Sequence, residues 1–113
     1  MTSSFDTTPG KLQINLTGDL IGGADAMKFS VDLRESLAAF AKNPLLFKEG
    51  AGGGLVVIDA GSVGFVNSSG LGMLIAARQA AQEHGAEFRL HAPGEQLKHL
   101  LEVTKLTEIL GAA

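Results

Sequence analysis

The sequence predicts an α/β fold, in which a single-layer mixed and mainly parallel β-sheet is packed with helices in the order β-α-β-α-β-α. Three observations lead to this prediction. Apolar residues recur at every second position in residues 11–17 and 87–92, which is the period of a strand with one buried face. They recur at every third or fourth position in longer segments between and after these strands, which is the period of a helix. Residues 55–58 form a continuous apolar run, typical of a strand buried on both faces of a parallel sheet.

The N-terminal part of the chain is predicted to contain one strand. Leu12, Ile14 and Leu16 alternate with polar residues, and a glycine-rich stretch then ends the strand in a loop. Residues 1–9 are expected to form a loose N-terminal segment. Because 113 residues are the length of one domain, a single domain over residues 1–113 is expected.

A long helix is predicted over residues 24–42. Its apolar residues are spaced by four, four and three positions, so they stack on one face: Phe29, Leu33, Leu37 and Phe40. Asn43-Pro44 ends this helix, because a residue before proline is disfavoured in the helical region. The glycine-rich residues 48–54 are predicted to be a plain linker, since they lack the Gly-Lys-Ser/Thr ending of a phosphate-binding loop.

The second half of the chain repeats the alternation of strand and helix. Asp59 closes the buried strand, and residues 60–66 are expected to form a loop. A helix then runs from Asn67 to about His84, with Gly85 as its C-terminal stop. Small side chains on this helix predict that it lies close to the sheet: Ala76, Ala77, Ala80 and Ala81.

The last predicted elements are the strand of residues 87–92 and a helix. Pro93 and Gly94 supply the turn that separates them. Several apolar residues are expected to complete the core from the C-terminal end: Leu97, Leu100, Leu101, Leu106, Ile109 and Leu110.

Composition argues against several classes of protein. The net charge is −3 and no cluster of Lys and Arg occurs, so no direct nucleic-acid binding is expected. The absence of cysteine excludes disulfides, thiol chemistry and Cys-ligated zinc. No apolar run could span a bilayer and no secretion signal is present, so we expect a cytoplasmic protein without membrane insertion. The histidines lack metal-ligand spacing, and neither a metal nor a cofactor is expected: His84, His91 and His99.

Motifs that would indicate an enzyme are incomplete. Gly70 and Gly72 resemble the start of a dinucleotide-binding fingerprint, but Ile75 stands where the third glycine belongs. The serines at 68 and 69 are not framed by the glycines of a nucleophile elbow. Since no paired carboxylates or nucleophile-base set occur either, the chain is not expected to be an enzyme.

The most informative segment, residues 59–74, follows the carboxyl end of the buried strand, where α/β proteins tend to meet ligands and partners. Ser68 lies at the start of the helix, and two interpretations remain open. It is a helix N-cap that satisfies free backbone N–H groups, or it is a site for phosphate, which the positive end of a helix favours. Phosphorylation would add roughly −1.5 to −2 charges. That charge would oppose docking on an apolar patch formed by Val63, Phe65, Val66, Leu71 and Met73.

This segment resembles the signature of the STAS domain family. In that family a strand ends in Asp and, after a short loop, Asp-Ser-Ser/Thr-Gly-Leu-Gly opens a helix. Here the corresponding parts are residues 57–59 and 68–74. Residues 16–20 resemble the family's Leu-x-Gly-Glu/Asp-Leu segment, and residues 97–110 resemble its leucine-rich helix and ending. The resemblance covers about residues 10–110 and implies the STAS fold.

The resemblance also implies a role, that of an anti-sigma factor antagonist. In these proteins the first serine of the pair is phosphorylated by a partner kinase that is also the anti-sigma factor. Ser68 occupies this position and Ser69 is the second choice. The implied partner surface includes Asp19 and Asp59. Structural roles, a turn for Asp19 and a strand-end cap for Asp59, are equally open. The surface also includes further residues near the serine pair: Asn67, Ser69 and Gly70. Asn67 stands where the family often has Asp.

Two other functions remain open. One is a STAS adaptor subunit of a membrane-lipid transport complex, which would dock on a transporter ATPase and would not need the serine pair. The other is a STAS domain excised from an anion transporter or a stress-signalling scaffold. A homodimer is also left open.

Overall fold

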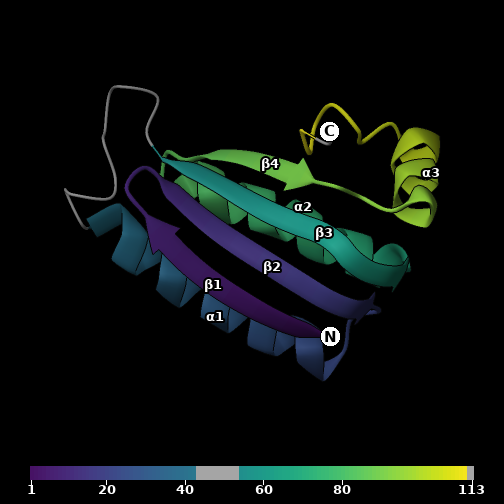
Figure 1. The fold of residues 1–113 in the computed structure, drawn as a ribbon, viewed down its shortest axis with the longest axis horizontal. Helices are drawn as coiled ribbons and strands as arrows, with labels where there is room; N and C mark the ends of the chain where they lie inside the picture. Colours follow the sequence, from purple (N-terminus) through teal and green to yellow (C-terminus); the bar gives the residue numbers. More distant parts are fainter. Residues whose placement is uncertain (43–53, 112–113) are drawn as a thin grey trace.

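The computed structural model describes residues 1–42 and 54–111. It contains four strands and three helices in the described parts (Figure 1), namely β1 (Thr2–Thr8), β2 (Lys11–Leu20), α1 (Ala24–Lys42), β3 (Leu55–Val66), α2 (Ser68–Glu83), β4 (Glu87–His91) and α3 (Glu95–Thr104). The predicted helix end at Asn43-Pro44 and nearly all of the predicted linker, residues 48–54, lie outside the described residues.

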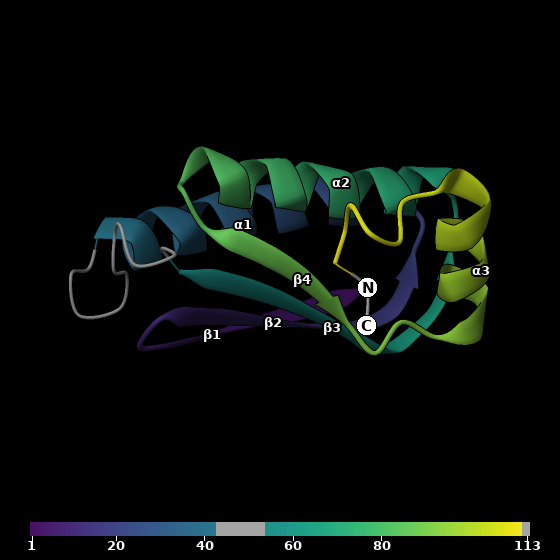
Figure 2. The same ribbon diagram turned by 90° about the horizontal axis from the view of Figure 1, so that it is seen from above.

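The four strands form one sheet in the order β1-β2-β3-β4. β1 runs antiparallel to β2, and the β2–β3 and β3–β4 pairs are parallel. This confirms the predicted mixed, mainly parallel sheet. Helices α1 and α2 lie side by side on one face of the sheet, while α3 stands at its end (Figure 2).

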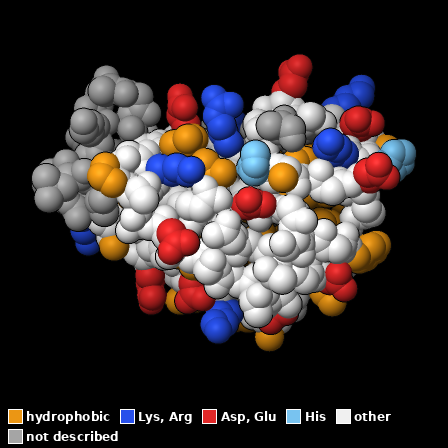
Figure 3. Space-filling view, viewed as in Figure 1, with side chains coloured by type: hydrophobic (Ala, Val, Ile, Leu, Met, Phe, Trp, Pro, Cys, Tyr) orange, Lys and Arg blue, Asp and Glu red, His pale blue; other side chains and the backbone are white. Residues whose placement is uncertain are grey.

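The two faces of the sheet have different chemistry, as the alternation in β2 predicts. Leu12, Ile14 and Leu16 are at most 1% exposed and face the helices. On the opposite face the Gln13 side-chain nitrogen donates to the Asn15 side-chain oxygen at 3.1 Å. Figure 3 shows this uncovered face, on which charged groups of both signs are scattered among polar side chains and backbone. The core therefore lies mainly between the sheet and α1 and α2, with α3 closing one end, while Val57 of β3 is 9% exposed on the opposite face, beside Gln13.

The expectation of a loose segment at residues 1–9 is wrong, because Thr2–Thr8 form strand β1 along the edge of the sheet. Phe5 pairs with Ile14 in the strand register and stacks on Phe29 of α1 with ring centroids 6.1 Å apart. Backbone hydrogen bonds to β2 hold a strand whose other side chains are small and polar. A single aromatic residue among Ser, Thr and Asp leaves little periodic signal in the sequence.

Replacing Phe5 with alanine is expected to lower the free energy of unfolding by about 1–3 kcal/mol, because the half-buried ring would leave its contact with Phe29. Urea denaturation of both proteins would measure the difference. Thr7→Ala, an exposed position on the same strand, is the matched control and should change stability by less than about 0.5 kcal/mol. Equal effects of the two substitutions would contradict an anchoring role for Phe5.

Two strands extend further than predicted. β2 continues to Leu20 and β3 continues through the expected loop of residues 60–66. Their parallel pairing persists there, with Thr17 opposite Ser62 and Leu20 opposite Val66, but the register shifts twice. These irregularities break the alternation of apolar and polar residues, which is why the sequence pattern indicates a loop where the structure has a strand.

The predicted core is largely confirmed. The apolar face of α1 and the small residues Ala77 and Ala81 of α2 are buried, so α2 lies close to the sheet. Leu110 is fully buried and its carbonyl oxygen accepts a hydrogen bond from the Leu90 backbone N–H at 3.2 Å. Ile109 is 48% exposed, so its expected place in the core is wrong. The C-terminal segment turns only one of the two neighbouring side chains inward.

Candidate functional site

The N-terminus of α2 is built by Asn67, which is the N-cap of this helix. Its side-chain oxygen accepts a hydrogen bond from the Gly70 N–H at 2.9 Å. Its backbone N–H donates to the Leu20 carbonyl at 3.2 Å, and its side-chain nitrogen donates to the Ile21 carbonyl at 3.3 Å. The interpretation of Ser68 as the N-cap is therefore wrong, because one residue earlier an amide already performs this role and also ties the helix to the end of β2.

Ser68 and Ser69 are the first two residues of α2, and both are exposed. Within residues 1–42 and 54–111, the backbone N–H groups of these two serines donate to no protein acceptor. They stand at the positive end of a 16-residue helix dipole. A phosphate on Ser68 would thus meet free N–H donors and a favourable local potential.

Gly70 brings the first turn of α2 against the end of β2. A Cβ atom at this position would overlap the Leu20 carbonyl oxygen and would lie 2.8 Å from the Leu20 Cβ atom. Gly22 makes a similar approach, since a Cβ there would lie 2.9 Å from the Ser69 Cβ. The loop before α1 therefore packs closely against one side of Ser69.

The two acidic residues of the predicted surface occupy different places. A side-chain oxygen of Asp19 accepts from the Phe65 backbone N–H at 3.0 Å, which links β2 to β3 beside the start of α2. A side-chain oxygen of Asp59 accepts from the Gly61 N–H at 2.8 Å in the middle of β3, because that strand does not end where the sequence pattern indicates. The structure thus places Asp19 near the serine pair and Asp59 away from it.

The expected apolar docking patch is mostly part of the core. Val66, Leu71 and Met73 of this patch are buried, and so is Gly70 of the wider predicted partner surface. Val63 is half-buried, and Phe65 is 51% exposed. Ile21, which the sequence analysis does not single out, is 54% exposed and its carbonyl contacts the Asn67 side chain. The exposed apolar surface at this site is therefore formed by Ile21 and Phe65.

Gln96 of α3 is a second residue that the sequence analysis misses. Its side-chain oxygen accepts from the Val66 N–H at 3.0 Å, and its side-chain nitrogen donates to the Val66 carbonyl at 2.9 Å. The amide side chain thereby pairs with the last residue of β3 as a neighbouring strand would. A lone glutamine in the first turn of a helix carries no sequence signal for this contact.

The described residues, 1–42 and 54–111, include neither a metal-ligand cluster nor a membrane-spanning helix. No three residues among His, Cys, Asp and Glu are grouped there in a way that could hold a metal ion. Among the described helices, none has the length and apolar character needed to cross a membrane.

Solved structures with the same fold include anti-sigma factor antagonists and a sulfate transporter family protein. The anti-sigma factor antagonist SpoIIAA in its unphosphorylated form matches with a TM-score of 0.72 at 13% identity, over 99% of this chain and 88% of that one. An anti-sigma factor antagonist from Mycobacterium paratuberculosis matches with a TM-score of 0.73 at 20% identity, over 98% and 83%. A sulfate transporter family protein from Wolinella succinogenes matches with a TM-score of 0.62 at 14% identity, over 94% and 75%. The molecule thus has the fold of the anti-sigma factor antagonists.

The family follows from the sequence itself. The family model described as Mlab, STAS domain, matches residues 3–111, and the chain belongs to this family of STAS domains. No curated protein matches the sequence. Membership confirms the family that the residues around Ser68 indicate.

Proposed function

We propose that this protein is an anti-sigma factor antagonist that acts in the cytoplasm and regulates transcription indirectly. It binds an anti-sigma factor with serine-kinase activity, and phosphorylation of Ser68 by that kinase ends the interaction. The observation that carries this proposal is the exposed Ser68 at a helix N-terminus, whose first two N–H groups meet no acceptor among the described residues 1–42 and 54–111.

The surroundings of Ser68 support a switch. Ile21 and Phe65 offer exposed apolar surface beside it, while Asp19 holds the Phe65 backbone in place. A partner that buries this surface would have to desolvate any charge on Ser68, which costs far more for a phosphate dianion than for a hydroxyl. The similar protein SpoIIAA is known in an unphosphorylated and a phosphorylated form.

Binding to the partner is expected to depend on the charge at position 68. Ser68→Ala should retain the captured kinase, whereas Ser68→Asp should weaken its binding by at least about tenfold, because a charge is placed inside a desolvated interface. Affinity capture from cell lysate, followed by mass spectrometry and titration of the identified partner, would measure both. Incubation of the pair with ATP and Mg²⁺ should add one phosphate to wild type and none to Ser68→Ala.

Ser4→Asp is the matched control, because it introduces the same charge at an exposed serine on β1. It should bind as wild type does. Equal binding by Ser68→Ala and Ser68→Asp, with no phosphate transfer, would contradict the proposal.

The second candidate is an adaptor subunit of a membrane-lipid transport complex, with Ser68 unmodified. One observation favours it, namely that the matching family model bears the name Mlab rather than that of an antagonist. Asn67 already caps α2, so this function would leave Ser68 without a special role. Capture of transporter subunits to the same extent by wild type and Ser68→Asp would select this candidate.

A further inference from the structure

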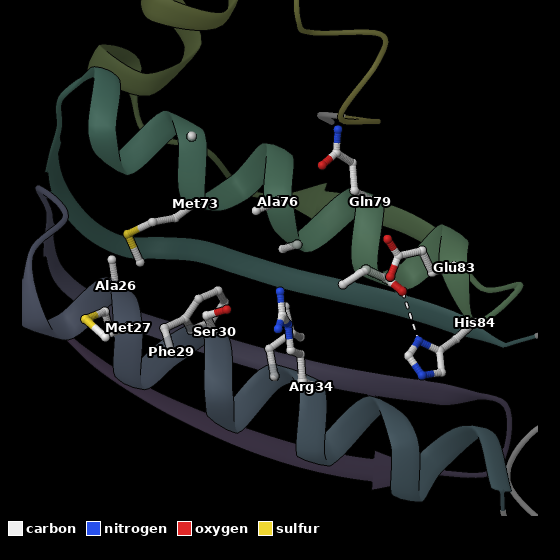
Figure 4. Close-up of a pocket in the computed structure, with 14 residues that line it drawn as sticks. Ala26, Met27, Phe29, Ser30, Arg34, Met73, Ala76, Gln79, Glu83 and His84 are labelled. Carbon is white, nitrogen blue, oxygen red and sulfur yellow. Dashed lines mark hydrogen bonds between the residues drawn. The ribbon is translucent and has the colours of Figure 1, made fainter.

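A groove of about 760 Å³ runs between α1 and α2 on the side of these helices that faces away from the sheet (Figure 4). Its floor includes the core residues Phe29, Leu33 and Ala77. Its α2 wall is formed by the small residues Gly72 and Ala76 along with Ala80. Among the described residues, a Cβ atom at Gly72 would meet nothing within 4 Å beyond its own helix backbone and chain neighbours. Small residues on this wall leave room for a side chain from outside.

An apolar ridge accompanies this groove. Met27, on the α1 wall, is 74% exposed, and Val31, one turn further along α1, is 55% exposed. Single exposed apolar residues are common on protein surfaces, but Met27 lines the groove and Val31 lies one turn from Met27 on the same helix. One face of the molecule thus carries both an exposed apolar ridge, formed by Met27 and Val31, and a groove with small residues on one wall.

Opposite charges stand on the two walls toward one end of the groove. Arg34 comes from α1 and Glu83 from α2, with His84 beside it (Figure 4). In the parts of the chain that the structure describes, the ion pair found joins the Met1 amino group to Asp25, so neither Arg34 nor Glu83 is paired there. Both charges are available to a partner that brings an acid and a base to this end.

We propose that the groove binds a second copy of this chain, which forms a symmetric homodimer through α1 and α2. A two-fold interface is self-complementary, so one surface must supply both members of every contact. This face does so, because the Met27 ridge of each copy fits the small-residue groove of the other, as ridges pack into grooves between helices. Arg34 of each copy meets Glu83 of the other, which gives two reciprocal ion pairs. A partner of different sequence would need to reproduce both features independently.

The size of this face sets the expected affinity. The 16 residues of α2 span about 24 Å, and two adjacent helices are about 20 Å wide, so each copy offers roughly 500 Å². A total of about 1,000 Å² is at the lower end of specific interfaces. The dimer should therefore be reversible, with a dissociation constant in the micromolar range.

Sedimentation equilibrium of the purified chain, from about 1 to 500 μM, would test the proposal, since this range brackets a weak dimer. Arg34→Glu and Glu83→Arg should each raise the dissociation constant at least about tenfold, because two attractions become two repulsions. The double variant should return to within about threefold of wild type, since both pairs are re-formed with reversed polarity. Met27→Asp should abolish the dimer.

Val103→Asp is the matched control, because Val103 is 66% exposed on α3, outside the groove, and the substitution introduces the same charge. It should dimerise as wild type does, and circular dichroism should show that all variants are folded. A monomer at every concentration would overturn the proposal, as would single variants whose effect the double variant does not reverse. The experiment uses the purified protein alone, so its result is independent of any kinase that acts on Ser68.

Discussion

Replacing Gly70 with alanine is expected to lower the free energy of unfolding by more than about 3 kcal/mol, or to prevent folding altogether. The added Cβ atom would overlap the Leu20 carbonyl oxygen and press on the Leu20 side chain. Neither group can move freely, because Leu20 is buried and its carbonyl accepts the Asn67 N–H. The substitution would therefore push the start of α2 away from the end of β2.

Gly72→Ala is the matched control, two residues further along the same helix. In the described part of the chain, nothing beyond the helix's own backbone and the chain neighbours lies within 4 Å of the added Cβ atom. Since alanine also favours helix, a gain of about 0.5–1 kcal/mol is expected. Thermal and urea denaturation of both variants would measure the contrast. Similar stabilities for the two variants would mean that the close approach at Gly70 does not govern the stability of this site.

Replacing Gln96 with alanine is expected to lower the free energy of unfolding by about 2–4 kcal/mol. Two hydrogen bonds would be lost, and both backbone groups of Val66, which is 1% exposed, would lose their partners. Gln82→Ala, at an exposed position of α2, is the control and should change stability by less than about 0.5 kcal/mol. Hydrogen exchange would locate the effect, since the Val66 N–H should lose its protection first.

The Gln96→Glu variant keeps the shape of the side chain and changes only its hydrogen-bonding groups. A carboxylate only accepts hydrogen bonds, so it would face the Val66 carbonyl oxygen unfavourably, whereas a protonated carboxyl both donates and accepts. The folded state of this variant therefore binds a proton more tightly than the unfolded state does. Its stability deficit relative to wild type should shrink as the pH falls. A deficit that does not change with pH would contradict the double hydrogen bond.

Much of the fold can be predicted from the sequence, because regular periods report which side chains are buried. The apolar spacing from Phe29 to Phe40 predicts α1, and the alternation from Leu12 to Leu16 predicts the inner face of β2. The start of α2 is predicted for a different reason, since capping residues and glycines gather at Asn67 to Gly70. β1 is not predicted, because backbone hydrogen bonds attach it to the sheet and its side chains show no apolar period.

The site is predicted only in part. The serine pair is recognisable because the residues around it resemble a family signature, and the structure exposes both serines at the helix start. The docking patch is not recognisable, since apolar residues in one segment can face inward or outward. Leu71 and Met73 face the core, while Phe65 and Ile21 face the solvent.

By itself the sequence determined the α/β class, the two long helices, the family and the position of the candidate serine, because each depends on local periods or on a short contiguous motif. Only the tertiary structure decided that Asn67 rather than Ser68 caps α2, that Gly70 faces the Leu20 carbonyl and that Gln96 completes the end of β3. Contacts over about 30 to 50 positions in the chain join Gly70 to Leu20, Gln96 to Val66, and Asn67 to the end of β2. No local pattern encodes them, since each depends on how neighbouring elements approach one another once the core has formed.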